Sequence, residues 1–214
     1  MAWTAPSTWV AGAILTAAQL NTQLRDNMLA GGPIYATEAL RDAAITSPFE
    51  GQRAYITGST VATATGTTQA IPTGIQTIYN GTAWVCVTPV GTSSITTAST
   101  TSTSFVTTLT GDAAAQSVTL STGTSALIMF SAVNNINAAA QGITAVSVSG
   151  ATTRAAVQAE GAYNGATGTN IGVGRSFVLT GLTAGTNTFT LNYGAFSSGT
   201  LTYVSRSLVV QGIA

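Results

Sequence analysis

Thr180-Gly181-Leu182-Thr183-Ala184-Gly185-Thr186 is a glycine-punctuated connection that leads directly into a strand-forming segment. Thr, Val, Ile and Phe favour strands, whereas Gly, Asn and Ser favour the turns between them. The same alternation of strand-favouring and turn-favouring residues extends from about Phe105 to the last residues. It gives these candidate strands: Phe105–Leu109, Ser117–Leu120, Ala126–Val133, Ile143–Ser149, Ala155–Ala159, Ile171–Leu179, Thr186–Tyr193 and Leu201–Gln211.

Many short strands at near-regular spacing predict a sandwich or a barrel, and roughly eight strands in about 120 residues suit a jelly roll. We therefore predict a mainly β chain whose residues 91–214 form a jelly-roll-like antiparallel β-sandwich. Pro89-Val90-Gly91 is expected to be a hinge, and Thr92 to Ser104 a linker or an extended first strand. A β-bulge is the preferred interpretation of Gly172-Val173-Gly174-Arg175.

Residues 33–90 are predicted to form a small mixed α+β module. Thr37 can cap a short helix over residues 38–44, and Pro48-Phe49-Glu50-Gly51 is a turn. Gln52 to Thr57 alternates as a strand does, with Ala54 and Ile56 on one face. Val61 to Ala70 has no periodicity and is expected to be a loop.

The same module carries a hairpin signal. Asn80-Gly81 separates Ile75–Tyr79 from Thr82–Val87, and such a dipeptide between two strand-like runs is a strong hairpin pattern. Trp84 is expected to form a small core with Tyr55, Ile56 and Tyr79.

The N-terminal part, residues 1–32, is predicted to be an extended arm followed by a single helix. Thr16-Ala17-Ala18-Gln19 matches a capping box, and Gly31-Gly32-Pro33 ends the helix. Leu20, Leu24 and Met28 then share one face. A helix of about four turns is marginal alone in water, so this face must dock on the rest of the chain or on another chain.

Trp3 and Trp9 lie in the arm before the helix, where Pro6 and Gly12 oppose helix formation. Two large apolar side chains without a core of their own are typical of a docking segment. The alternative is that both rings pack on the chain's own domain.

Charged residues make up only 6% of the 214 residues, and the net charge is +0. A typical protein carries about a quarter charged residues. A surface of Thr, Ser, Gly, Asn and Gln suits a protein held in a large assembly or facing the medium. The six Arg residues are scattered and there is no Lys, so we expect no nucleic-acid binding.

Neither membrane insertion nor export is expected. The start of the chain lacks the charged and apolar pattern of a signal peptide, and the longest apolar run, Ala126 to Phe130, is too short for a bilayer. Cys86 is the single cysteine, so no intrachain disulfide can form, and it is expected to be a buried, inert thiol.

Enzymatic activity is not expected, because the chain has no His. His is the commonest general base and metal ligand, and zinc sites need Cys/His clusters. Paired carboxylates could still hydrolyse glycans. However, Asp112 occupies a turn where local hydrogen bonds explain it, and Glu160 ends a strand beside a loop; the other carboxylates are Glu38, Glu50, Asp26 and Asp42. We expect no catalytic residues, no metal and no cofactor.

Aromatic residues in polar, glycine-rich loops are the candidates for ligand binding. Tyr163, Asn164, Tyr193 and Phe196 lie in such loops, and aromatic rings there suit contact with carbohydrate or protein. The alternative is that they cap the ends of the sandwich or pack between subunits.

Two segments carry a resemblance. Trp9-Val10-Ala11-Gly12, Leu15 to Thr22 and Leu24 to Leu29 resemble the N-terminal segment of tailed-phage virion proteins, mostly minor tail or tail-fibre proteins. Thr37 to Ile45, Pro48 to Gln52 and Tyr79 to Trp84 are similar to a small module of phage tail-fibre and appendage proteins. The resemblance implies a virion component fixed to the particle by its N-terminus, through Trp3, Trp9, Leu20, Leu24 and Met28.

These observations predict a structural virion protein of a tailed bacteriophage, in the tail rather than the capsid, assembled in the host cytoplasm. Its expected partners are other virion proteins, two further copies of itself in a homotrimer, and a host surface glycan or protein. A capsid decoration or head-fibre protein is the first alternative. A carbohydrate-binding module is the alternative of another class.

Overall fold

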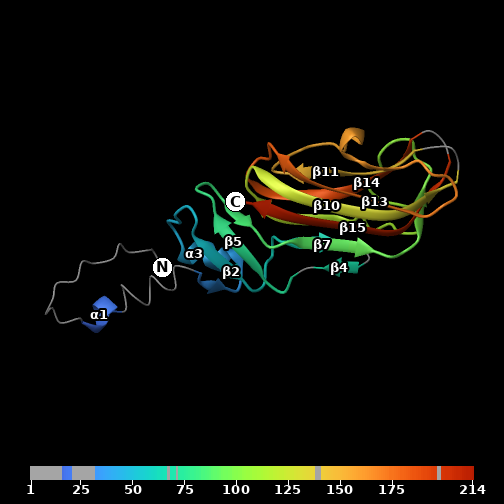
Figure 1. Ribbon diagram of the computed structural model, residues 1–214. Helices are drawn as coiled ribbons and strands as arrows, with labels where there is room; N and C mark the ends of the chain where they lie inside the picture. Colours follow the sequence, from blue (N-terminus) through green and yellow to red (C-terminus); the bar gives the residue numbers. More distant parts are fainter. Residues whose placement is uncertain (1–15, 21–31, 67, 71, 138–140, 197–198) are drawn as a thin grey trace.

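The computed structural model describes residues 16–20, 32–66, 68–70, 72–137, 141–196 and 199–214. The chain is mainly β, as predicted. Figure 1 shows a two-layered sandwich, with a small module of strands and one helix at one end of it.

The sandwich consists of two antiparallel sheets. One has the strand order β13-β10-β15-β7-β4 and the other β12-β11-β14-β9-β3, where β3 is Thr63–Thr65 and β4 is Thr68–Ala70. Its main strands are β7 (Val90–Ser94), β9 (Ser117–Thr122), β10 (Ser125–Ile136), β11 (Gln141–Gly150), β12 (Ala162–Asn164), β13 (Ile171–Thr180), β14 (Gly185–Phe196) and β15 (Leu201–Ile213). A short strand, β8 (Ala98–Thr100), also pairs with β15.

The strand order is that of a jelly roll. The first main strand, β7, pairs with the last, β15, and the second, β9, pairs with the next to last, β14. The pattern continues inward, since the third main strand, β10, pairs with the third from last, β13, and β11 pairs with β12. The predicted jelly-roll-like sandwich is therefore confirmed.

Alternation along the long strands builds the core between the sheets. In β10 the even-numbered residues, including Ile128 and Phe130, are buried and the odd-numbered residues are not. Phe189 and Leu191 of β14 are fully buried, as is Leu208 of β15. Each such side chain contributes about 1.5–3 kcal/mol by leaving water.

A β-bulge at Val204 changes the alternation of β15. Asn134 pairs with Tyr203, whereas Val133 pairs with Ser205, so Val204 is the extra residue. Because the bulge adds one residue, Tyr203 and Arg206 both face the interior, although an odd separation normally places residues on opposite faces. Both are at most 2% exposed.

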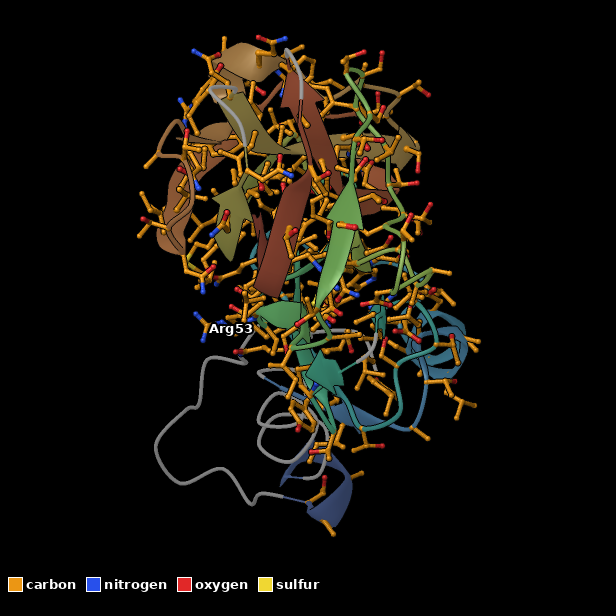
Figure 2. All side chains as sticks on the ribbon, turned by 90° about the vertical axis from the view of Figure 1, so that its right-hand side faces the viewer. Arg53 is labelled. Carbon is orange, nitrogen blue, oxygen red and sulfur yellow. The ribbon has the colours of Figure 1, made fainter. Side chains whose placement is uncertain are left out.

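The small module contains a sheet of order β1-β2-β5-β6 and one helix. Its elements are β1 (Ile34–Tyr35), α3 (Glu38–Ala44), β2 (Arg53–Ile56), β5 (Ile75–Tyr79) and β6 (Trp84–Cys86). Thr37 caps α3 by accepting a hydrogen bond from the Leu40 N–H, as predicted. Ala54 and Ile56 are buried, and the exposed Arg53 projects from the side of the molecule (Figure 2).

The predicted Asn80-Gly81 hairpin is present, with a four-residue loop. Tyr79 pairs with Trp84, and the Asn80 side chain accepts hydrogen bonds from the N–H groups of Thr82 and Ala83. Gly81 has φ of 88°, a conformation that favours glycine. Tyr79 and Trp84 contact edge-on at 5.6 Å.

The composition of the small core was only partly predicted. Tyr55 is 40% exposed and does not belong to it. The ring of Trp84 instead lies 4.5 Å from the Arg41 guanidinium.

Several sequence-based expectations for the strands are wrong. Residues 61–70 are not a loop, because β3 (Thr63–Thr65) pairs with β9 and β4 (Thr68–Ala70) pairs with β7. Val90 and Gly91 of the expected hinge at residues 89–91 belong to β7. The expected strands at 105–109 and 155–159 are absent, and 171–180 continues in regular register without a bulge.

These errors have physical reasons. Strands β3, β4 and β7 are rich in Thr, Ser, Ala and Gly, so apolar periodicity does not reveal them. In residues 105–109 only isolated bridges form, such as Val106 with Tyr193. In the N-terminal part, the structure describes α1 (Ala17–Leu20), and the rest of the predicted arm and helix lies outside the described residues.

Candidate ligand-binding platform

The residues predicted to attach the chain to a particle lie almost entirely outside the described structure. Trp3, Trp9, Leu24 and Met28 belong to residues 1–15 and 21–31, and only the backbone of Leu20 is described, at the end of α1. Their attachment role stays a prediction.

The four residues predicted to bind a surface ligand do not form one site. Tyr193 and Asn164 are each 1% exposed, so they cannot meet an external ligand. The Asn164 amide donates to the backbone oxygen (3.0 Å) and the side-chain oxygen (2.8 Å) of Asn134, which ties β12 to β10. The half-buried Phe196 packs edge-on against Phe105 at 4.9 Å.

Tyr193 and Phe196 therefore pack within the sandwich, which was the alternative interpretation. Of the four, Tyr163 lies at the surface, with 44% of its area exposed. It directs attention to the loop between β11 and β12.

That loop contains a short 3-10 helix, η2 (Gln158–Glu160), which protrudes above β11 (Figure 1). Side chains from outside the helix hold all three of its residues. The Tyr163 hydroxyl donates to the Gln158 carbonyl at 2.5 Å, and Arg175 Nη1 donates to the Ala159 carbonyl at 2.7 Å.

The third contact is an ion pair, in which Arg154 Nη2 donates to Glu160 Oε1 at 2.5 Å. We call the surface formed around η2 the η2 platform; its polar members are Arg154, Gln158, Glu160, Tyr163 and Arg175.

Regular strands position the groups of the η2 platform. Tyr163 lies on β12 opposite Ile143 of β11, and Arg175 lies on β13 opposite Phe130 of β10. The Arg175 guanidinium is 5.4 Å from the ring of Phe177. Because strands hold the side chains that fix the loop, the platform is a preorganised surface.

The η2 platform holds every charged side chain of the described sandwich that is not buried, with Arg175 exposed and Arg154 and Glu160 partly exposed. Residues 91–214 contain five charged side chains. Asp112 and Arg206 are buried, so Arg154, Glu160 and Arg175 remain. Guanidinium donors, a carboxylate acceptor and the exposed Tyr163 suit a polar ligand with hydroxyl or amide groups.

Asp112 lies at the predicted turn, and its Oδ1 accepts a local hydrogen bond from the Ala114 N–H at 3.3 Å, but the prediction missed its main partner. Its carboxylate pairs with the Arg206 guanidinium and accepts a hydrogen bond from Ser94 Oγ at 2.8 Å. Arg206 Nη2 also donates to Ser94 Oγ at 2.8 Å. The signal missed is an isolated Arg within the otherwise apolar and hydroxyl-bearing β15.

Two tyrosines border this ion pair, and their rings pack edge-on at 4.8 Å. The Tyr203 hydroxyl lies 2.9 Å from Thr144 Oγ1, whereas the Tyr193 hydroxyl has no hydrogen-bond partner among the described residues. Burial raises the pKa of both phenols far above the usual value, so both stay neutral. The cluster is closed to ligands and serves packing.

Two of the remaining carboxylates, Glu38 and Asp42, have structural partners, and Asp26 lies outside the described residues. Glu38 accepts hydrogen bonds from Ser59 Oγ and the Thr60 N–H, and Asp42 pairs with Arg41 at 2.8 Å. Burial opposes ionisation of Glu38, but these hydrogen bonds outweigh it and lower its pKa. Among the described residues, no cluster of three His, Cys, Asp or Glu side chains could hold a metal.

Cys86 is 1% exposed, so its predicted burial is confirmed. Burial raises the pKa of its thiol to about 11. A thiol of this kind is a poor nucleophile at neutral pH. The described helices are too short or too polar to cross a membrane.

A hollow lies between the small module and the end of β15. Its volume is about 310 Å³, and Glu50 is its one charged lining side chain; the others are Gly51, Ile78, Tyr79, Asn80 and Ala214. None of these lining residues has a cationic side chain, in contrast to the η2 platform with its two arginines.

Comparison with known proteins identifies no family. No family model matches the chain, and no curated protein does either. Among solved structures, the chain is similar to a protein of infectious bursal disease virus Gx strain (13% identity, TM-score 0.38, covering 65% of this chain and 41% of that one).

It is also similar to the Clostridium thermocellum xylanase 10B CBM22-1-GH10 modules (11% identity, TM-score 0.31, 58% and 26%). A third is the exo-β-1,3-galactanase of Phanerochaete chrysosporium (18% identity, TM-score 0.28, 63% and 32%). The chain covers less than half of each of these proteins, and likeness at this level carries no functional argument.

Proposed function

We propose that this chain is a non-enzymatic structural protein of a tailed-bacteriophage virion, a minor tail or tail-fibre component. Residues 1–32 attach it to neighbouring virion proteins, and the sandwich projects outward. The resemblance of the N-terminal segment and of the small module to phage appendage proteins supports this proposal.

The observation that carries the proposal is the distribution of charge on the jelly roll. Its described surface is nearly free of charge except at the η2 platform, which lies on the loop between β11 and β12. Such a surface suits a protein that is held in an assembly and presents one polar patch to an external partner. Host-surface contact is therefore assigned to the platform.

The absence of catalysis is part of the proposal. A glycosidase needs two carboxylates facing each other across a cleft. Asp112 is bonded inside the core and Glu160 is paired with Arg154 at the surface. The two carboxylates are therefore committed to different structural contacts.

Electron microscopy of virions labelled with gold-coupled antibodies against the full chain tests the proposal. We expect gold at the tail. Gold spread over the head would support the capsid-decoration or head-fibre alternative, and unlabelled virions would contradict a virion role altogether.

A homotrimer built around the helix face of Leu20, Leu24 and Met28 is also proposed, since three such faces could bury one another. Changing Leu24→Asp is expected to abolish trimer formation or virion incorporation and to leave the sandwich folded. If Leu24→Asp leaves the molecular mass of the oligomer and its incorporation into virions unchanged, the proposed trimer is contradicted.

Carbohydrate binding is the second candidate function, and the η2 platform favours it. Arg175 and Glu160 supply a donor and an acceptor beside the exposed ring of Tyr163. We expect the full chain to bind surface polysaccharide of the host, and Arg175→Ala to weaken this binding about tenfold or more. Arg53→Ala is the matched control, because Arg53 is an exposed arginine of the small module (Figure 2). Equal binding by both variants would contradict a glycan site at the platform.

A further inference from the structure

Arg175 of β13 differs from the other arginines of the sandwich, because its guanidinium has no carboxylate partner among the described residues. Arg206 pairs with Asp112 in the interior. Arg154 pairs with Glu160 at the surface, and this pair is neutral as a whole. The exposed Arg175 therefore gives the η2 platform one net positive charge. An accessible cation on an otherwise neutral surface attracts anionic ligands.

The guanidinium of Arg175 is held in a fixed position. Its Nη1 donates to the Ala159 carbonyl at 2.7 Å, and it lies 5.4 Å from the ring of Phe177, which leaves β13 on the same face. The other N–H groups of the guanidinium have no acceptor among the described residues. Because the side chain is already ordered, a ligand that bonds to these groups loses less conformational entropy on binding.

The free donors of Arg175 match a carboxylate in shape and in charge. Two parallel N–H groups of a planar guanidinium fit the two oxygens of a carboxylate in a bidentate pair. One net positive charge balances one carboxylate. A phosphate monoester brings about −1.5 to −2 charges, which the platform cannot neutralise.

Apolar groups suited to a sugar ring lie beside this guanidinium. Tyr163 is 44% exposed and Val157 is 41% exposed. The Tyr163 hydroxyl and Arg175 Nη1 donate to consecutive carbonyls of η2, whose Cα atoms are about 3.8 Å apart. An aromatic ring and a methyl-bearing side chain can contact the C–H groups of a sugar while the guanidinium binds its carboxylate.

We propose that the η2 platform binds an acidic polysaccharide, in which Arg175 holds the carboxylate of a uronic-acid sugar and Tyr163 contacts the sugar ring. This inference rests on the carbohydrate-binding function proposed for the platform and adds the charge of its ligand. Glu160 opposes such a ligand, because its carboxylate lies on the same platform and repels another carboxylate. Removal of the Glu160 charge therefore strengthens binding.

Titration of the full chain with polygalacturonate tests the inference, at one ionic strength throughout. Methyl-esterified polygalacturonate is the matched control ligand, since it has the same backbone and no carboxylate charge. We expect the acidic polymer to bind at least about tenfold more tightly than the ester, because it makes charge-assisted hydrogen bonds with the guanidinium. Poly-L-glutamate is the control for carboxylates that are not attached to sugars.

Three variants identify the residues responsible. Arg175→Gln should weaken binding of the acidic polymer about tenfold or more, and Arg175→Lys should keep part of it because the charge remains. Arg53→Gln removes the same charge from an exposed arginine of the small module and should change binding by less than about threefold (Figure 2). Glu160→Gln should bind the acidic polymer about threefold more tightly. Thermal unfolding verifies that each variant is folded.

Several results would overturn the inference. These are equal binding of the acid and the ester, equal losses for Arg175→Gln and Arg53→Gln, and poly-L-glutamate binding as tight as that of polygalacturonate. If the chain binds host surface polysaccharide but neither form of polygalacturonate, the acidic ligand is wrong and the carbohydrate-binding function stands. If it binds no polysaccharide at all, both are wrong, and the virion role is still decided by the microscopy.

Discussion

Arg206 and Asp112, which are 94 residues apart in the sequence, form a hydrogen-bonded ion pair in the interior of the jelly roll. Their side chains are only 1% and 6% exposed. Both are therefore removed from water, and each is stable only because the other is present. The pair connects the last strand, β15, to the loop that precedes β9.

Removing one partner of this pair should destabilise the fold strongly. We expect Asp112→Ala to lower the free energy of unfolding by about 3–5 kcal/mol, because Arg206 would stay buried and unpaired. Urea unfolding measures the effect. Glu160→Ala is the control, because its ion pair with Arg154 is partly exposed and should contribute about 1 kcal/mol or less. Equal losses for the two variants would contradict the interior role of Asp112.

The two core tyrosines give a matched pair of hydroxyl deletions. Tyr203→Phe should cost about 1–2 kcal/mol, since it leaves Thr144 without its 2.9 Å partner. Tyr193→Phe should change stability by less than about 0.5 kcal/mol, because its hydroxyl has no described hydrogen-bond partner. Denaturant unfolding of the two variants checks this, and a larger loss for Tyr193→Phe would show that its hydroxyl is bonded in solution.

Acid should weaken the small module through Glu38. Hydrogen bonds from Ser59 and Thr60 lower its pKa below the ordinary 4.5 despite burial. A lowered pKa in the folded state means that the stabilisation is present above about pH 4.5 and is lost as the pH falls through the folded pKa. Unfolding curves between pH 3 and pH 7 for the unmodified chain and Glu38→Gln measure it. We expect the difference between them to shrink toward the acid end, and a constant difference would contradict the assignment.

Cys86 should resist alkylation in the native protein. With its pKa raised to about 11 by burial, roughly one thiol in 1,000 is ionised at pH 8. We expect iodoacetamide to react at least about 100-fold more slowly with the native chain than with the chain in urea, as followed by mass spectrometry. Comparable rates would show that the thiol is accessible.

The same thiol gives a prediction for alkaline pH. Because its folded pKa lies above the ordinary 9.0, the stabilisation is complete below pH 9 and is lost as the pH rises toward 11. In unfolding curves measured as the pH rises toward 11, Cys86→Ala should lose less stability than the unmodified chain, because it lacks this thiol.

The jelly roll could be predicted from the long strands, because β10, β13, β14 and β15 carry enough Val, Ile, Phe and Leu to reveal their alternation. β7 could not, since Gly91, Thr92 and Ser93 give no apolar period and Pro89 suggests a hinge. Its place is fixed by pairing with β15 more than 100 residues later, a long-range contact that local patterns do not contain.

The candidate site was predictable only in part. Tyr163 was identified as a loop aromatic residue and is exposed, although it lies on β12, whereas Glu160 was placed at the end of a strand and belongs instead to η2. Nothing in the local sequence indicates that Arg175, on another strand, donates to the loop carbonyl of Ala159. Conversely, Tyr193 precedes glycine and resembles a loop residue, but it continues β14 into the core.

Strands β3 and β4 have a consequence for how such proteins can be recombined. β3 pairs with β9 and β4 pairs with β7, so residues 63–70 extend both sheets of the sandwich from within the segment that the sequence assigns to the small module. A chimaera joined at residue 90 would separate the jelly roll from these strands and leave the backbone edges of β7 and β9 open to pairing with other chains. Exchange of the sandwich between related chains therefore requires a crossover before Thr63, so that the edge strands stay with the sandwich they complete.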